Sequence, residues 1–351
     1  MPSPAESSES LRKLDRQIKR NTRGILREIL PRTRREAPRG KWRGQAQAVL
    51  DQAHPTHLTH HLLRRVERHD LKVTRGLSFM NFMVQESESR RLGIPSAPWL
   101  LDQKLAAYHF LDAINVRRPK TDLVEYKFSD LPKEHPAVIK PVRSTGSRSC
   151  YLVFSPSKII HVLDGEEFSS WLGMEQHARN EMSRKQQRPL PDRWFIEELV
   201  LEDHAQQTPA PDLKFFTFYG QVEMILEVRR LGGNSRYSFR LPDRTPVIPG
   251  SWKYEYFEGE GASPAHLEVA KQVSMEIPHP FARIDMLKGE DGLVFGELTP
   301  RPGGFHRFSD QWDRRFGEAW VAAQHRLNQD LLHGKRFTAY HEAVAGLSLT
   351  S

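Results

Sequence analysis

The sequence has almost no cysteine and no long apolar run. Its 351 residues include one cysteine, Cys150, which excludes an internal disulfide framework and is typical of proteins in a reducing compartment. No stretch approaches the ~20 apolar residues of a membrane span, and the first residues, MPSPAESSESLRKLDRQ, lack the apolar core of a secretory signal. We therefore expect a cytoplasmic protein without a transmembrane segment.

Hydrophobic residues are also scarce. They make up 38% of the chain, and the mean hydropathy is -0.61. A single core stops growing near ~250 to 300 residues, so this length predicts two or three packed units. The low hydrophobic content indicates that part of the chain, the N-terminus first of all, contributes little to any core.

Positive charge is concentrated near the N-terminus. The net charge is +8, and residues 12–44, RKLDRQIKRNTRGILREILPRTRREAPRGKWRG, carry many Arg and Lys against few acids. The pattern predicts a basic helix around residues 11–30, followed by a break rich in Pro and Arg. Such a segment is either a solvated helix or a site for a polyanion, namely nucleic acid, an anionic membrane surface or an acidic polymer that serves as substrate or carrier.

Three histidines suggest a metal site at first sight. Residues 45–71 have a helical pattern, and His54, His57 and His61 would fall on one face of that helix. No cysteine or acid completes a ligand set with a recognised spacing. We interpret these histidines as part of a solvated helix face.

Two lysines occupy positions suited to phosphate binding. A helix is predicted within residues 93–120, with Asp102 as its N-cap, which places Lys104 in the first turn where a cation opposes the helix dipole. A short strand at residues 137–140 ends with Lys140 and leads into the loop RSTGSRS and a second strand, CYLVF. This loop resembles neither a Walker A loop nor a GxGxxG turn. Its small residues could still fold over phosphates, and they are Ser144, Thr145, Gly146 and Ser147.

Two hairpins carry charged residues at predicted strand positions. The first has a strand from Phe215, a turn at Gly220 and Gln221, and a strand through Val228; Asp212 and Lys214 stand at its entrance. The second pairs FARIDML, residues 281–287, with DGLVFGEL, whose strand ends at Glu297.

The second hairpin predicts a metal site. Arg283 and Asp285 lie two residues apart and therefore on the same face of their strand. Antiparallel pairing would bring Asp285 and Glu297 close enough to share a cation. Two buried like charges are costly without one.

The order of these segments resembles the ATP-grasp superfamily, and more closely its TupA-like members. The segments that carry the resemblance are DLKFFTFYG, RIDML and VFGELTPRPGGFHRFSDQWDRRFGEAW, whose Glu, Thr, Gly-Gly and W-D-x-x-x-G elements are similar to the closing motif of that family. The resemblance covers residues 92–331.

The resemblance implies an α+β fold of the ATP-grasp type. It consists of a small leading α/β subdomain, a lid subdomain and a central antiparallel sheet, here preceded by a basic helical N-terminal extension. We expect the extension, partly disordered, at residues 1–75, the leading subdomain at 76–135, the lid at 136–200, and the catalytic, metal-binding subdomain at 201–351.

The resemblance also implies ATP and Mg²⁺ as cofactors. Lys104, Lys140 and the loop of residues 144–147 would contact the nucleotide phosphates. The ribose would be bound by Glu202, Asp203 or Asp212. The adenine would meet the backbone of a hinge made of Glu197, Glu198, Leu199 and Val200.

Mg²⁺ would be bound by Asp285 and Glu297, since oxygen ligands suit this ion. Many ATP-grasp enzymes have a third ligand, Asn, at the position of Thr299. Because Thr takes that place here, the number of metal ions is left open.

The activity implied is that of an ATP-dependent carboxylate-amine ligase, which forms an amide or peptide bond through an acyl phosphate. Its substrates would be an amino acid, a peptide or a sugar acid together with an amine. Arg283 is expected to stabilise the tetrahedral adduct, with Arg301 and Lys214 as the next candidates. Two alternatives stay open, a kinase on the same fold and a polyanion-binding protein with a vestigial ATP site.

Overall fold

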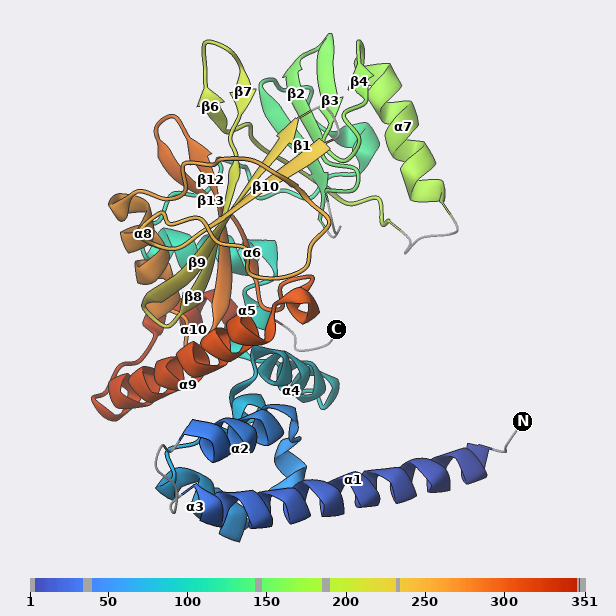
Figure 1. Cartoon of the computed structure of the whole chain (residues 1–351). Helices are drawn as coiled ribbons and strands as arrows, with labels where there is room; N and C mark the ends of the chain where they lie inside the picture. Colours follow the sequence, from blue (N-terminus) through green and yellow to red (C-terminus); the bar gives the residue numbers. More distant parts are fainter. Residues whose placement is uncertain are drawn as a thin grey trace. The chain divides into compact units, whose positions relative to one another are not determined.

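The computed structural model describes residues 4–33, 40–142, 147–184, 190–231, 234–345 and 347. The protein is of the α+β class, with three sheets and a helical N-terminal region. The chain folds into two compact units (Figure 1). Unit 1 comprises Met1–Phe82 with Asp310–Glu318, and unit 2 comprises Met83–Ser309 with Ala319–Ser351. The predicted subdomain boundaries remain predictions.

Unit 1 begins with the helix predicted around residues 11–30, which is helix α1 (Pro4–Arg32). Figure 1 shows α1 extending well beyond the two helices that pack on its last turns, α2 (Gly40–Gln52) and α3 (His60–Arg68). The core between them is built from side chains repeated at helical spacing. These are Leu26 and Leu30 of α1, Ala46 and Leu50 of α2, and Leu62 and Val66 of α3.

The expectation that His54, His57 and His61 share a helical face is wrong. Pro55 and its neighbours form a separate 3₁₀ turn, η1 (Pro55–His57), with His54 as its N-cap. His61 lies in α3, which starts after Thr59 caps it. A proline suits the first turn of a new element and ends the preceding helix, so one continuous helix does not form here.

The W-D-x-x-x-G segment anchors the end of unit 1. After η2 (Thr74–Leu77), the backbone N–H of Met80 in α4 (Phe79–Arg91) donates to Asp313 Oδ1 at 2.7 Å. Asp313 belongs to α9 (Asp310–Leu332). Gly317 of the same helix lies directly against the backbone of Leu77.

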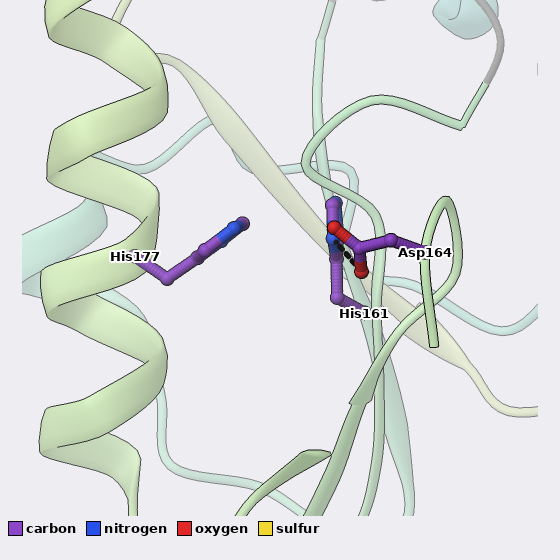
Figure 2. A group of neighbouring side chains, drawn as sticks. All are labelled: His161, Asp164 and His177. Atoms are coloured by element: carbon purple, nitrogen blue, oxygen red, sulfur yellow. Dashed lines mark hydrogen bonds and ion pairs between the residues drawn. The ribbon is translucent and has the colours of Figure 1, made fainter. Parts of the chain in front are cut away.

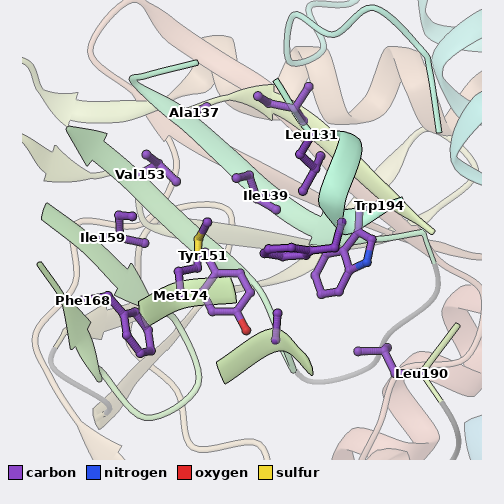
Figure 3. Packing of buried hydrophobic residues seen from close by; sticks show 13 residues of the cluster. Leu131, Ala137, Ile139, Tyr151, Val153, Ile159, Phe168, Met174, Leu190 and Trp194 are labelled. Atoms are coloured by element: carbon purple, nitrogen blue, oxygen red, sulfur yellow. The ribbon is translucent and has the colours of Figure 1, made fainter. Parts of the chain in front are cut away.

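Unit 2 contains a five-stranded antiparallel sheet, with strand order β4-β3-β2-β1-β5. Strands β1 (Ala137–Pro141) and β2 (Tyr151–Ser155) confirm the strands predicted around the STGS loop. The others are β3 (Lys158–His161), β4 (Glu167–Phe168) and β5 (Trp194–Glu198). Together with α7 (Trp171–Ser183), the sheet encloses the core in Figure 3, which includes Ile139, Tyr151 and Trp194.

The second sheet of unit 2 has six strands in the order β11-β10-β9-β8-β12-β13. Both predicted hairpins are confirmed. Their strands are β8 (Asp212–Phe218), β9 (Gln221–Leu231), β12 (Ala282–Gly289) and β13 (Gly292–Thr299). The sheet is completed by β10 (Asn234–Arg240) and β11 (Glu255–Tyr256).

The first hairpin differs in detail from its prediction. Strand β8 begins at Asp212 rather than Phe215, because the buried charges of Asp212 and Lys214 are compensated by ion pairs. The turn consists of Tyr219 and Gly220, both at positive φ, 37° and 83°, so Gln221 already belongs to β9. Positive φ at both central residues gives the twist that a two-residue hairpin needs.

Shorter elements connect and flank the two larger sheets of unit 2. Helix α6 (Lys104–Ala113) begins at Lys104, and its N-cap is Gln103, not the predicted Asp102. No helix in the described ranges is long and apolar enough to cross a membrane. The remaining elements are α5 (Ala97–Leu100), η3 (Phe128–Asp130), β6 (Leu201–Asp203) paired with β7 (Thr208–Pro209), α8 (Pro264–Met275), η4 (Phe305–Arg307) and α10 (Thr338–Val344).

We predict that Gly317→Ala destabilises the protein. A Cβ atom at Gly317 would lie 1.5 Å from the carbonyl oxygen of Leu77, so backbone must move. Overpacking of this kind typically costs about 1–3 kcal/mol. The matched control is Gly24→Ala in α1, where a Cβ meets nothing within 4 Å and alanine favours the helix by about 0.5–1 kcal/mol. Thermal unfolding should show a lower Tm for Gly317→Ala and not for Gly24→Ala; equal shifts would contradict the packing role of Gly317.

Candidate functional site

The strand register gathers charged side chains on one face of the six-stranded sheet. Asp285 of β12 is paired with Lys214 of β8 on one side and with Glu297 of β13 on the other. Arg283 lies two residues before Asp285 and is paired with Thr299. Directly opposed residues share a face of a sheet, so the register predicted for Asp285 and Glu297 is confirmed.

Asp285 is the centre of this face. Its side chain is fully buried, and both carboxylate oxygens accept hydrogen bonds from cations. Arg283 donates through Nε and Nη2 at 2.7 and 2.6 Å, and Lys214 donates through Nζ at 2.5 Å. The Arg283 guanidinium also donates to Thr299 Oγ1 at 2.9 Å. Pairing through two parallel hydrogen bonds holds the carboxylate in position and stabilises its negative charge.

We expected two buried acids here to require a metal ion, and these contacts show that they do not. Arg283 and Lys214 neutralise Asp285 directly, so its burial needs no further cation. Glu297 is not buried: 66% of its side chain is exposed, and Arg283 is 3.9 Å away. Its pKa is nevertheless raised, first by partial desolvation over the sheet and then by the negative charge of Asp285.

These residues can still accommodate Mg²⁺. Glu297 presents an accessible carboxylate, and its one ion pair among the described residues is the long contact with Arg283. Among the described residues, Asp285 Oδ1 accepts one hydrogen bond, from Arg283, which leaves a lone pair. Mg²⁺ is bound in proteins through one or two carboxylates, and its other ligands are water or phosphate oxygens. The donor set of Asp285 and Glu297 fits that requirement.

The ionic network continues along β8 to a residue that the sequence reasoning missed. Lys214 is 3.1 Å from Asp212 Oδ2, and Arg230 of β9 is 2.7 Å from the same oxygen. Burial alone would raise the pKa of Asp212, but Lys214 and Arg230 outweigh it and hold that pKa well below its usual range. The predicted strand ended at Val228, and Arg230 stands two positions beyond it. Its basic side chain, so close to a strand end, was the signal in the sequence.

A second charged cluster joins α6 to the five-stranded sheet. Glu197 is buried, with 4% of the residue exposed, and its carboxylate accepts hydrogen bonds from Lys104 Nζ at 3.1 Å and Tyr108 OH at 2.8 Å. Lys140 Nζ contacts the other oxygen of Glu197. The structure therefore brings together three residues that the sequence analysis assigned to the nucleotide site. The prediction gave Glu197 a role through its backbone, whereas here its side chain holds the two lysines.

Burial and mutual repulsion set the charges of this cluster. Burial, followed by the positive charge of Lys140, lowers the pKa of Lys104 to about 8. Burial also disfavours the charged form of Glu197, but Lys140 and Lys104 outweigh it and lower the Glu197 pKa to about 2. Burial opposes the charge of Lys140 as well, and Glu197 reverses this effect and raises its pKa. Two lysines and one carboxylate leave about one positive charge near neutral pH.

Cations of both clusters act on the thiol of Cys150. Its pKa is raised, first by burial, while Lys140 and Lys104 of one cluster and Arg230 of the other act to lower it.

The other predicted site residues are placed differently. Ser144, Thr145 and Gly146 lie outside the described residues, and Ser147 has a φ of 61° in the turn before β2. Arg301 donates to Ser87 Oγ at 2.7 Å and lies 5.6 Å over the ring of Trp99. Among the described residues it forms no ion pair with the network around Asp285.

The predicted hinge of residues 197–200 begins within strand β5, whose last two residues are Glu197 and Glu198. Glu198 forms an ion pair with Arg117 at 2.9 Å. Leu199 and Val200 are buried and connect β5 to β6. Within the described ranges, no backbone group pairs with the N–H or C=O of Leu199. An unpaired backbone donor and acceptor at this position is the arrangement that an adenine edge could use.

The three candidates for ribose binding are all engaged. Glu202 forms a bidentate ion pair with Arg229 at 2.6 and 2.8 Å. Asp203 accepts the backbone N–H of Gln206 at 2.8 Å, and Asp212 belongs to the network described above. The choice among them therefore remains open.

A group of His161, Asp164 and His177 resembles a metal site (Figure 2). His161 Nε2 accepts the backbone N–H of Ser149 at 3.2 Å, which requires the ring proton to be on Nδ1. Nδ1 then donates to Asp164 at 2.8 Å. Both nitrogens of this buried histidine are occupied, and a metal ligand needs a free lone pair. We interpret the group as a hydrogen-bond network in the core of the five-stranded sheet.

Comparison with known proteins identifies a family. The model of the family described as "TupA-like ATPgrasp" matches residues 88–321. No curated protein matches the chain.

Solved structures share only a low similarity. D-alanine–D-alanine ligase from Bacillus anthracis is 13% identical with a TM-score of 0.39, over 73% of this chain and 76% of that one. The Helicobacter pylori enzyme is 11% identical with a TM-score of 0.35, over 64% of this chain and 61% of that one, so the chain matches about three fifths of its length. The ATP-grasp ligase PsnB, complexed with precursor peptide PsnA2 and AMPPNP, is 10% identical with a TM-score of 0.35, over 66% and 60%.

We predict that Glu197→Gln strongly destabilises unit 2, because it leaves Lys104 and Lys140, whose side chains are only 20% and 22% exposed, without their carboxylate. Removing one partner of a buried pair costs about 3–5 kcal/mol. The neighbouring Glu198→Gln, whose ion pair is more exposed, should cost much less. Denaturant unfolding of both variants measures the difference.

The same prediction has a pH dependence. The Glu197 pKa is lowered from 4.5 to about 2, so its stabilising contribution is fully present above pH 4.5 and is lost as the pH falls toward 2. The gap between the wild type and Glu197→Gln in the free energy of unfolding should narrow over that window. A constant gap from neutral pH down to pH 2 would show that the charge of Glu197 is not what stabilises the cluster.

Proposed function

The chain belongs to the TupA-like ATP-grasp family, and from this we propose that it is an ATP-dependent carboxylate-amine ligase that releases ADP and phosphate. The family match spans residues 88–321, which includes both charged clusters. The proposed substrates are an amino acid, peptide or sugar acid and an amine. A ligase needs a site for a triphosphate and a site for a metal, and each cluster supports one of these.

One observation carries the proposal. The register places Asp285 opposite Glu297, with Lys214 and Arg283 bonded to Asp285 on the same face. When bound by Asp285 and Glu297, Mg²⁺ would offset the negative charge of the phosphate oxygens. The two cations next to this acid pair would contribute in the same direction.

The second cluster supports nucleotide binding. Lys104 and Lys140 share the Glu197 carboxylate and leave an excess positive charge at the hinge of residues 197–200, to which Glu197 belongs. A phosphate oxygen that approaches the lysines would find ammonium groups already held in place, so little ordering entropy is lost on binding. We assign Lys104 and Lys140 to the phosphates and Leu199 to the adenine edge.

The proposed reaction has two steps. In the first, an oxygen of the substrate carboxylate attacks the γ-phosphorus, the bond from this phosphorus to the β,γ-bridging oxygen breaks, and ADP leaves. In the second, the amine nitrogen attacks the acyl carbon, the carbon–oxygen bond to the phosphoryl group breaks, and phosphate leaves while the nitrogen loses a proton. Positioning and charge neutralisation are what the protein has to supply in such a reaction.

Arg283 is the proposed donor to the tetrahedral oxyanion of the second step. Its Nε and Nη2 are bonded to Asp285 and Thr299, which fix the plane of the guanidinium. A fixed donor needs no reorganisation when charge develops. Arg301 points to Ser87 and Trp99 instead, and we assign it to the binding of an acidic acceptor.

The ligase activity predicts that wild-type protein with Mg-ATP releases ADP and phosphate only when both an acid and an amine are present. We would screen amino acids, peptides and uronic acids against amines and detect the amide by mass spectrometry. Glu297→Gln should lower turnover at least about 100-fold without changing Tm, because its side chain is largely exposed. The matched control is Asp291→Asn in the turn of the same hairpin, which is 72% exposed.

Two results would overturn this assignment. A phosphorylated acceptor without free phosphate would identify a kinase. Full turnover of Glu297→Gln would remove this residue from the metal site.

The lowered Lys104 pKa makes ATP affinity depend on pH. With a pKa of about 8, Lys104 is mostly charged at pH 7 and mostly neutral at pH 9, so the Kd for ATP should rise about tenfold over this range. Lys104→Arg keeps its charge and should show a flat profile, whereas Lys104→Met should bind weakly at both pH values. Isothermal titration calorimetry measures the Kd. A wild-type Kd that is equal at pH 7 and pH 9 would contradict the role of Lys104.

A further inference from the structure

The excess positive charge of the chain lies outside the family match. Residues 1–82 contain 18 Lys and Arg against 8 Asp and Glu, a net charge of +10. Residues 83–351 contain 34 against 36, a net charge of -2. Neither the nucleotide site nor the metal site accounts for this asymmetry, so unit 1 has a separate reason to be basic.

Helix α1 presents this charge on one side. At 100° per residue, Arg12, Arg16, Arg20, Arg23 and Arg27 fall within about 80° of one another around the helix axis. Within the described part of the chain, Arg12, Arg20 and Arg27 have no salt bridge with an acid. These guanidinium groups are therefore available to an anionic partner.

The opposite side of α1 is apolar and exposed. Leu11, Leu14, Ile18 and Ile25 are 67%, 54%, 44% and 44% exposed. Their spacing of three, four and seven residues places them on one stripe, about 170° from the arginines. The core of unit 1 uses other residues of α1, Leu26 and Leu30, so the stripe is not part of it. Figure 1 shows the first half of α1 reaching beyond α2 and α3.

We propose that α1 binds the surface of an anionic phospholipid bilayer. The stripe of Leu11, Leu14, Ile18 and Ile25 would enter the boundary between headgroups and acyl chains, and the basic side chains would contact lipid phosphates. A helix with an apolar stripe, an Arg- and Lys-rich polar face and few apolar residues outside the stripe lies in the membrane interface. Charge complementarity selects anionic over zwitterionic lipid.

Two other occupants fit the helix less well. Nucleic acid would use the arginines but leave the apolar stripe in water, and α1 contains no aromatic residue for stacking on bases. A second copy of α1 could form a coiled coil only through a continuous apolar seam. That seam is interrupted, because Asn21 and Glu28 occupy the heptad positions between and after the exposed leucines and isoleucines.

The test is sedimentation of the full chain with vesicles of phosphatidylcholine alone and of phosphatidylcholine mixed with phosphatidylglycerol. We expect binding to the mixed vesicles, weakened by salt, and little binding to phosphatidylcholine alone. The triple variant Leu11→Gln, Leu14→Gln, Ile18→Gln should lower vesicle affinity at least about tenfold. The triple variant Arg12→Gln, Arg16→Gln, Arg20→Gln should remove the preference for anionic vesicles.

A matched control replaces three exposed apolar residues of unit 2, Leu172→Gln, Ile248→Gln and Leu332→Gln, which are 64%, 75% and 86% exposed. It should bind vesicles like the wild type, and circular dichroism checks that all variants keep their helix content. Three outcomes would overturn the proposal. These are no binding to mixed vesicles, binding to heparin or DNA in place of vesicles with no effect of the apolar variant, and a dimer that the apolar variant dissociates without any vesicle binding. None of them bears on ligase activity.

Discussion

The buried carboxylate of Asp285 is the constraint on which the site depends. A fully buried acid is stable only if cations and hydrogen bonds replace its water, and here Arg283 and Lys214 do so. Lys214 in turn requires Asp212, and Asp212 requires Arg230. The chain of ion pairs crosses β12, β8 and β9. Each charged residue in it therefore depends on an oppositely charged partner on the same or the adjacent strand. These ion pairs leave Glu297 at the margin as the one acid of this network with an accessible carboxylate.

In both clusters a buried carboxylate is paired with cations, but the net charge of the two clusters differs. Around Asp285, three acids face three cations when Arg230, Asp212, Lys214, Arg283 and Glu297 are counted with it. Around Glu197, two lysines face one acid. The neutral cluster has an exposed acid that suits an added cation, whereas the other has a cationic excess that suits an added anion. The proposed ligand, a metal-bound triphosphate, carries both kinds of charge.

The hairpins and their register were predictable from the sequence, because strand periodicity and short turns are local signals. The same signals place Asp285 opposite Glu297, as the strand pairing confirms. The side-chain role of Glu197 was not predictable in this way, since Lys104 and Glu197 are 93 residues apart and belong to different elements. Arg230 was missed because the predicted strand ended at Val228, whereas β9 continues to Leu231 and so includes the partner of Asp212. The N-cap of α6 is Gln103 rather than Asp102, so the first residue of this helix was less predictable than the helix itself.

The closing motif of the family has two physical roles. Glu297 and Thr299 lie at the charged face, where Thr299 accepts from Arg283. Asp313 instead caps the backbone of Met80, and Gly317 admits the backbone of Leu77. A single stretch of sequence therefore supplies both a proposed metal ligand and packing within unit 1, where the start of α9 meets residues 77–80. The glycine is required by backbone proximity, not by chemistry at the site, so a motif residue need not be a site residue.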